Sequence, residues 1–120
     1  MDAHVIAVDE ANKDTVTFAE LATGLPLIQA PPPDTAPSRL IDVPVLDVIG
    51  QRDADFCAAD AVDCSTLDGV QHVEAPYYSP QAQLRIVVVP ATGHALNLHR
   101  TAPLWYAVAL AWTLLHFPPS

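Results

Sequence analysis

Residues 43–50 read Val-Pro-Val-Leu-Asp-Val-Ile-Gly, a nearly continuous apolar run that ends in glycine. A run of this kind is typical of a strand that is buried on both faces of a parallel sheet. Proline lacks the N–H group that a sheet ladder needs, so Pro44 fits only near the start of such a strand. This stretch therefore predicts an α/β fold.

The same pattern returns further along the chain, with helical segments around it. Residues 84–89 read Leu-Arg-Ile-Val-Val-Val, and β-branched side chains favour a buried strand. The segment between the two runs, residues 58–72, predicts a crossover helix that breaks near Gly69. Residues 103–117 have the best helical pattern, with apolar residues three to four apart and two prolines after it. Two buried strands joined by a crossover form a right-handed βαβ unit, so we predict the order strand, helix, strand, helix with the strands parallel.

Residues 1–40 differ in character from the rest. Residues 4–8, His-Val-Ile-Ala-Val, predict a short strand, and residues 15–21 predict a short helix that Asp14 caps and Gly24 ends. Four prolines between residues 30 and 38 predict an extended linker.

The chain thus divides into two predicted parts, an N-terminal segment with a Pro-rich linker at residues 1–40 and a βαβα part at residues 41–120. Two parallel strands bury little surface and leave two unpaired edges. We therefore expect the second part to be incomplete as a stand-alone domain and to belong to a larger parallel sheet.

Composition and charge exclude several classes of protein. The hydrophobic content of 51% is too high for intrinsic disorder. Lys and Arg number 5 against 14 acidic residues, a net charge of −9 that would repel nucleic acid. The longest apolar stretch, residues 102–117, is shorter than the ~20 residues that cross a bilayer, so we expect no membrane partner. No basic segment precedes an apolar run at the N-terminus, which predicts a cytoplasmic protein.

Polar residues follow both predicted strands. In parallel sheets, functional groups gather beyond the carboxyl ends of the strands. Here one strand end carries Asp53 and Asp55, and the other carries His94. A carboxylate that accepts a hydrogen bond from imidazole Nδ1–H fixes the tautomer and stabilises the imidazolium. The sequence therefore predicts an acid–histidine pair at this rim.

These residues resemble a known family. Val-Pro-Val-Leu running into Gly50-x-x-Asp53, followed by Gly93-His94, is similar to the C-terminal portion of an α/β-hydrolase. The resemblance implies that Asp53 and His94 are the acid and histidine of a Ser-His-Asp triad. It also implies ester or related acyl hydrolysis, with a small ester-like substrate of the complete enzyme and no cofactor. The Gly-x-x-Asp spacing favours Asp53 over Asp55, whose alternative role is to cap the turn.

The chain departs from that family at the nucleophile. None of its serines lies in a Gly-x-Ser-x-Gly elbow, and there is no glycine run for an oxyanion hole. Without these parts an Asp–His pair cannot form an acyl-enzyme, so we expect the chain to be inactive alone. The alternative function is a non-catalytic interaction chain that self-associates through its sheet edges, as a homo-oligomer, or completes the sheet of a partner.

The two cysteines, Cys57 and Cys64, lie too far apart for a CxxC redox or zinc pair. We favour small buried apolar residues for them, since the chain is expected to be cytosolic. A local disulfide is the alternative if the protein meets an oxidising compartment.

A metal centre is not predicted. His94 and His99, with either nearby aspartate, have neither the helical nor the zinc-finger spacing of ligands. His99 is expected to be a surface or capping residue.

Overall fold

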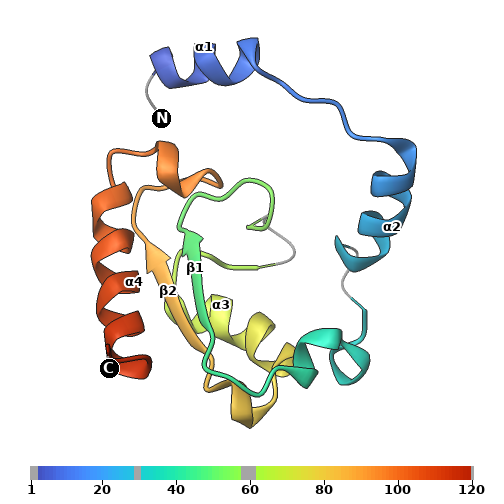
Figure 1. Ribbon diagram of the computed structural model, residues 1–120, viewed down its shortest axis with the longest axis vertical. Helices are drawn as coiled ribbons and strands as arrows, with labels where there is room; N and C mark the ends of the chain where they lie inside the picture. The colour runs from blue at the N-terminus through green and yellow to red at the C-terminus, as the bar shows by residue number, and fades with distance from the viewer. Residues whose placement is uncertain (1–2, 29–30, 58–61, 120) are drawn as a thin grey trace.

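Two parallel strands form the centre of the C-terminal part (Figure 1). The computed structural model describes residues 3–28, 31–57 and 62–119. Strand β1 (Leu46–Gly50) pairs with β2 (Arg85–Val89), from Leu46 opposite Arg85 to Gly50 opposite Val89. The predicted parallel pairing is therefore confirmed, and β1 begins two residues after Pro44 because proline has no N–H for the ladder.

Among the described residues between the strands, the α-helix is α3 (Leu67–Glu74), and two short 3₁₀ helices, Ala75–Tyr77 and Pro80–Ala82, follow it. Helix α3 begins later than predicted, and residues 58–61 lie outside the described residues. The expected break near Gly69 is wrong, because the Thr66 hydroxyl caps the helix by accepting a hydrogen bond from the Gly69 N–H. Gly69 thus lies in the first turn, where a cap offsets its low helix propensity.

The last element, α4 (Ala102–His116), agrees with the helix predicted at residues 103–117. It packs against β1, while α3 packs against β2. Residues 101–119 contain no Asp, Glu, Lys or Arg, yet several large apolar side chains of this region are exposed: Leu104, Leu110, Leu114, Leu115 and Phe117. None of the helices in the described residues is long and apolar enough to span a membrane.

The N-terminal part holds two helices, α1 (Ala3–Ala11) and α2 (Phe18–Ile28), which lie at the periphery, away from the strands (Figure 1). The strand predicted at residues 4–8 is therefore wrong. A short apolar run fits a strand or a helix equally well by periodicity, and no described strand lies beside it to pair with.

The start of α2 is a capping box rather than the predicted Asp14 cap. The Thr17 hydroxyl accepts from the Glu20 N–H at 3.2 Å, and the Glu20 carboxylate accepts from the Thr17 N–H at 2.7 Å. Two donors that the helix leaves unpaired are satisfied in this way, so the helix begins at Phe18. It also continues past Gly24, which was expected to end it.

The Pro-rich segment is more ordered than a linker. It contains two short 3₁₀ helices, Pro33–Thr35 and Pro37–Leu40. The Ser38 hydroxyl donates to the Tyr77 carbonyl oxygen at 2.6 Å, and the Arg39 guanidinium donates to the Pro76 carbonyl oxygen at 2.8 Å. These bonds fasten the segment to the chain that follows α3.

The hydrophobic core is small and lies between α3 and β2. Its buried members are Cys64, Val70 and Ile86, with partly buried neighbours from both strands. Burial of so few side chains leaves much of the apolar surface in contact with solvent.

Candidate functional site

The turns that follow β1 and β2 touch each other at the carboxyl end of the sheet. A β-carbon on Gly50 would overlap the carbonyl oxygens of Thr92 and Gly93, so only glycine permits this approach. The Arg52 N–H donates to the Thr92 carbonyl oxygen at 2.8 Å across the two turns. This contact places the residues after Gly50 beside the residues after Val89.

The turn after β2 is held on both sides of Thr92, which is fully buried. The Ala91 N–H donates to Gln51 Oε1 at 3.0 Å, and the Gly93 N–H donates to His99 Nε2 at 3.2 Å. Ala91 has a φ of 53°, in the left-handed region that alanine seldom adopts. The surrounding bonds thus hold a strained turn directly before His94.

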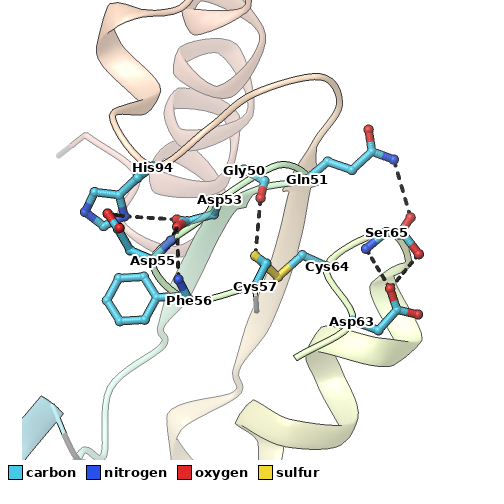
Figure 2. The surroundings of a disulfide bond; sticks show 10 residues. All are labelled: Gly50, Gln51, Asp53, Asp55, Phe56, Cys57, Asp63, Cys64, Ser65 and His94. Carbon is cyan, nitrogen blue, oxygen red and sulfur yellow. Dashed lines mark hydrogen bonds and ion pairs between the residues drawn. A yellow bond between two sulfur atoms is a disulfide. The ribbon is translucent and has the colours of Figure 1, made fainter. Parts of the chain in front are cut away.

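The structure brings the two predicted site residues together. His94 Nδ1 lies 3.0 Å from Asp53 Oδ2, as Figure 2 shows. Asp53 is only 4% exposed, and its other oxygen, Oδ1, accepts from the backbone N–H groups of Asp55 at 2.9 Å and Phe56 at 3.1 Å. Both carboxylate oxygens are therefore occupied, and the side chain has one orientation.

The hydrogen bonds determine the charge state of Asp53. Burial of the carboxyl favours its neutral form, but hydrogen bonds from His94 and from the backbone N–H groups of Phe56 and Asp55 favour the carboxylate and outweigh that effect. The pKa of Asp53 therefore lies below its ordinary value. The carboxylate is ionised at neutral pH and acts as an acceptor for His94.

The other ring nitrogen of His94 faces away from the carboxylate (Figure 2). The imidazole is about half exposed, at 53%. Among the described residues, Nε2 has no hydrogen-bond partner. A ring held by Nδ1 and open at Nε2 can accept a proton and return it.

Asp55, the rival acid, is placed differently. Its carboxylate oxygen lies 3.6 Å from His94 Nδ1, beyond hydrogen-bond distance, and the side chain is 67% exposed. The sequence alternative had Asp55 capping the turn, but the structure reverses that relation, because Asp53 accepts the Asp55 N–H. Asp53 therefore makes the closer contact with the imidazole.

Sequence reasoning missed two neighbours of the pair, Gln51 and Phe56, and it expected His99 to be only a surface or capping residue. The Phe56 ring lies 5.3 Å from the His94 ring, centroid to centroid. Phe56 follows Asp53 by three residues in the same turn, so its closeness in the sequence could have placed it near the site. Gln51 and His99 contact the turn after β2 through its folded shape, which no spacing in the sequence reveals.

The cysteines form a disulfide, Cys57–Cys64, so the favoured interpretation as free buried thiols is wrong. The Cα atoms of the two cysteines lie 5.5 Å apart, within reach of a disulfide, and spacing in the sequence alone could not distinguish this pair from two thiols. The Cys57 N–H donates to the Asp53 carbonyl oxygen at 3.0 Å. The disulfide thus closes the loop that begins at the acid turn (Figure 2).

The described serines do not face His94. Each donates its hydroxyl elsewhere: Ser38 to the Tyr77 carbonyl oxygen, Ser65 to the Asp63 carboxylate and Ser79 to the Ile41 carbonyl oxygen. Ser120 lies outside the described residues. Within the described part of the chain, no serine hydroxyl is hydrogen-bonded to the His94 imidazole.

The same side chains form a group that could hold a cation. Asp53, Asp55 and His94 each offer one ligand atom, and these atoms lie within 4.8 Å of one another. This group differs from the His94–His99 combination that the sequence spacing argued against. A cation bound to Nδ1 would displace the proton that joins His94 to Asp53, so metal binding and the pair exclude each other.

Comparison with known proteins adds no relationship: no family model matches the chain, and a search of the curated proteins finds no match.

Proposed function

We propose that this chain supplies the acid and the histidine of a Ser-His-Asp triad to an α/β-hydrolase-like enzyme that hydrolyses small ester-type substrates. The observation that carries the proposal is the 3.0 Å contact between His94 Nδ1 and Asp53 Oδ2 at the carboxyl ends of adjacent parallel strands. The Gly50-x-x-Asp53 and Gly93-His94 patterns, which resemble that family, support it.

Each residue has a defined role in this mechanism. Asp53 accepts the Nδ1–H and leaves the lone pair of His94 Nε2 available. Nε2 takes the proton of an attacking hydroxyl and then gives it to the leaving group, while Asp53 stabilises the imidazolium between the two steps. No cofactor takes part in these steps.

The nucleophile and the oxyanion hole come from residues outside this chain. The hydroxyls of the described serines are committed to other groups, and no Gly-x-Ser-x-Gly elbow is present. A carbonyl under attack also needs preorganised N–H donors, which stabilise the oxyanion more than any other single contribution. We therefore expect the 120 residues to be inactive alone and to complete a larger parallel sheet.

The test joins the chain to its upstream reading frame. We expect the DNA before Met1 to encode a Gly-x-Ser-x-Gly elbow in frame, and the joined protein to react with a fluorophosphonate on that serine. Labelling should be lost with His94→Ala and kept with His72→Ala, a control at an exposed histidine of α3. Stoichiometric, His94-dependent labelling of the 120 residues alone would contradict the proposal, as would labelling of the joined protein that survives His94→Ala.

A second candidate is the non-catalytic interaction chain. The exposed apolar side chains of α4 and the two-stranded sheet of the described residues favour it, because unpaired strands and apolar surface promote association. Light scattering tests this candidate by measuring the molar mass in solution, because association predicts a dimer or a larger particle. A monodisperse monomer that unfolds cooperatively would exclude this candidate.

The cellular location stays a prediction. The sequence favours the cytoplasm, whereas the Cys57–Cys64 disulfide is of the type that persists in oxidising compartments. Trapping of free thiols in cell extracts before oxidation would show which setting the chain occupies.

A further inference from the structure

His99 lies against the turn that carries His94. Its Nε2 is 3.2 Å from the Gly93 backbone nitrogen, and the imidazole is partly buried. A backbone N–H can only donate, so Nε2 must present its lone pair. The ring is therefore uncharged, with its proton on Nδ1.

We propose that His99, as a neutral imidazole, is a positioning residue that keeps His94 in contact with Asp53. The catalytic meaning of this inference rests on the proposed function, but the contact itself does not. His99 touches neither Asp53 nor His94 in any hydrogen bond of the structure and acts through Gly93.

The backbone on either side of His94 is fixed by this arrangement. Before it, the Gly93 N–H is bonded to His99, and a β-carbon on Gly93 would lie 3.3 Å from Nε2, so the ring also packs closely against the glycine. After it, the His94 carbonyl oxygen accepts from the Leu96 N–H at 2.8 Å. Loss of the Nε2 acceptor would leave a partly buried N–H unpaired, which is unfavourable.

His99 is itself anchored. Its N–H donates to the Leu96 carbonyl oxygen at 3.3 Å, and its carbonyl oxygen accepts from the Ala102 N–H at 3.0 Å. Ala102 is the first residue of α4 and is buried. Through His99, the turn that carries His94 is therefore connected to the start of helix α4.

The two histidines differ in what their Nε2 atoms do. Both carry the neutral-state proton on Nδ1, His94 because that atom donates to a carboxylate and His99 because its Nε2 accepts. Nε2 of His94 is free to take a proton, whereas Nε2 of His99 is occupied. Protonation of His99 would remove the acceptor that Gly93 needs.

The test uses a matched pair of variants, His99→Gln and His99→Leu. Glutamine Oε1 lies the same number of bonds from Cα as histidine Nε2 and can accept from Gly93, whereas leucine cannot. At mildly alkaline pH, where free imidazoles are neutral, nitrogen-15 NMR reports which ring nitrogen of His94 carries the proton.

We expect His99→Leu to convert His94 from the Nδ1–H form to a mixture of both tautomers and to speed hydrogen exchange of the Gly93 amide by up to about tenfold, the equivalent of one net hydrogen bond. His99→Gln should keep both at wild-type values. Thermal unfolding of each variant shows whether it is folded.

Two results would overturn the inference: a folded His99→Leu variant with the wild-type His94 tautomer, or a folded His99→Gln variant that loses it. If His99→Leu does not fold, the wild-type protein decides, because scalar coupling between the Gly93 N–H and His99 Nε2 must be observed. An Nε2–H tautomer at His99 would refute the bond directly. These measurements involve no substrate, so a joined protein that lacks hydrolase activity would count against the proposed function alone.

Discussion

Gly50 and Thr92 lie so close across the two turns that a β-carbon on Gly50 would overlap the Thr92 carbonyl oxygen. Gly50 is buried at the end of β1, and Asp53 follows three residues later. The 3.0 Å contact between Asp53 and His94 thus depends on a position that only glycine can occupy without moving the facing turn.

Substitution of this glycine should separate the turns. We expect Gly50→Ala to lower the free energy of unfolding by about 2 kcal/mol, because backbone atoms must move to admit the methyl group. Urea unfolding measures the loss, and nitrogen-15 NMR of His94 should show that the ring no longer donates to Asp53.

Gly24→Ala is the matched control. Gly24 lies within α2, and a β-carbon there would meet nothing within 4 Å. Alanine should stabilise that helix by up to about 1 kcal/mol. Equal urea midpoints for Gly50→Ala and the wild type would show that the turns are not in close contact.

The features of the fold that the sequence could predict are those marked by consecutive residues of one type. The apolar runs around Val48 and Val87 identify two buried strands, and parallel pairing then brings the residues after them to one rim. Asp53 and His94 could be paired in advance because both follow a strand directly. Their contact is a consequence of topology as much as of motif.

The parts that could not be predicted depend on how turns fold back. Whether Cys57 reaches Cys64 depends on the path of the loop, and whether His99 reaches Gly93 depends on a short 3₁₀ helix, Leu96–Leu98. The wrong prediction of a strand at residues 4–8, which lie in helix α1, has a different cause. That apolar run is too short for its periodicity to distinguish a strand from a helix.

Asparagine substitutions should distinguish the two neighbouring aspartates. In Asp53→Asn, the amide oxygen can still accept from the backbone of the turn, but the NH₂ group then faces His94 Nδ1 and forces the proton to Nε2. We expect turnover of the joined enzyme to fall by about 10⁴, as it does when a triad acid becomes an amide. Asp55 is exposed and outside hydrogen-bond distance, so Asp55→Asn should change turnover less than about tenfold. Equal losses, measured as kcat with an activated ester, would contradict the assignment of Asp53.

The disulfide should contribute to stability by an amount that increases slowly with the length of the loop it closes. Its cysteines are separated by seven residues in sequence, and cross-linking a loop of this size stabilises by about 2 kcal/mol. We expect dithiothreitol to lower the free energy of unfolding of the wild type by that amount. A Cys57→Ala/Cys64→Ala double variant should show the same loss and no further response to dithiothreitol. Rapid alkylation of either cysteine in the untreated, folded protein would show that the bond is absent.

Three ionisable groups have a raised pKa, the opposite of the shift at Asp53. Burial raises the pKa of Asp47 in β1, and burial together with the charge of Asp47 raises the pKa of Glu74 at the end of α3. Burial and both carboxylates raise the pKa of Tyr78 as well. Asp47 and Glu74 bind protons more tightly in the folded chain than in the unfolded one, so their contribution to stability falls as pH rises through their raised pKa values.

Asp53 has the opposite sign, since its pKa is lowered, and its contribution is lost as pH falls through that lowered value. Stability should therefore be greatest at weakly acidic pH and decline on both sides.

Asp47→Asn removes a half-buried charge, so it should raise the free energy of unfolding at pH 7 by the order of 1 kcal/mol, the usual size for one substitution. The gain should shrink as pH falls, because the wild-type carboxyl becomes neutral too. Asp42→Asn, at an exposed site just before the strand, should show no such gain. Urea unfolding of the wild type, Asp47→Asn and Asp42→Asn from pH 7 down to weakly acidic pH measures these differences in the free energy of unfolding. A loss of stability in Asp47→Asn at pH 7 would mean that a partner stabilises the Asp47 carboxylate and that burial does not destabilise it.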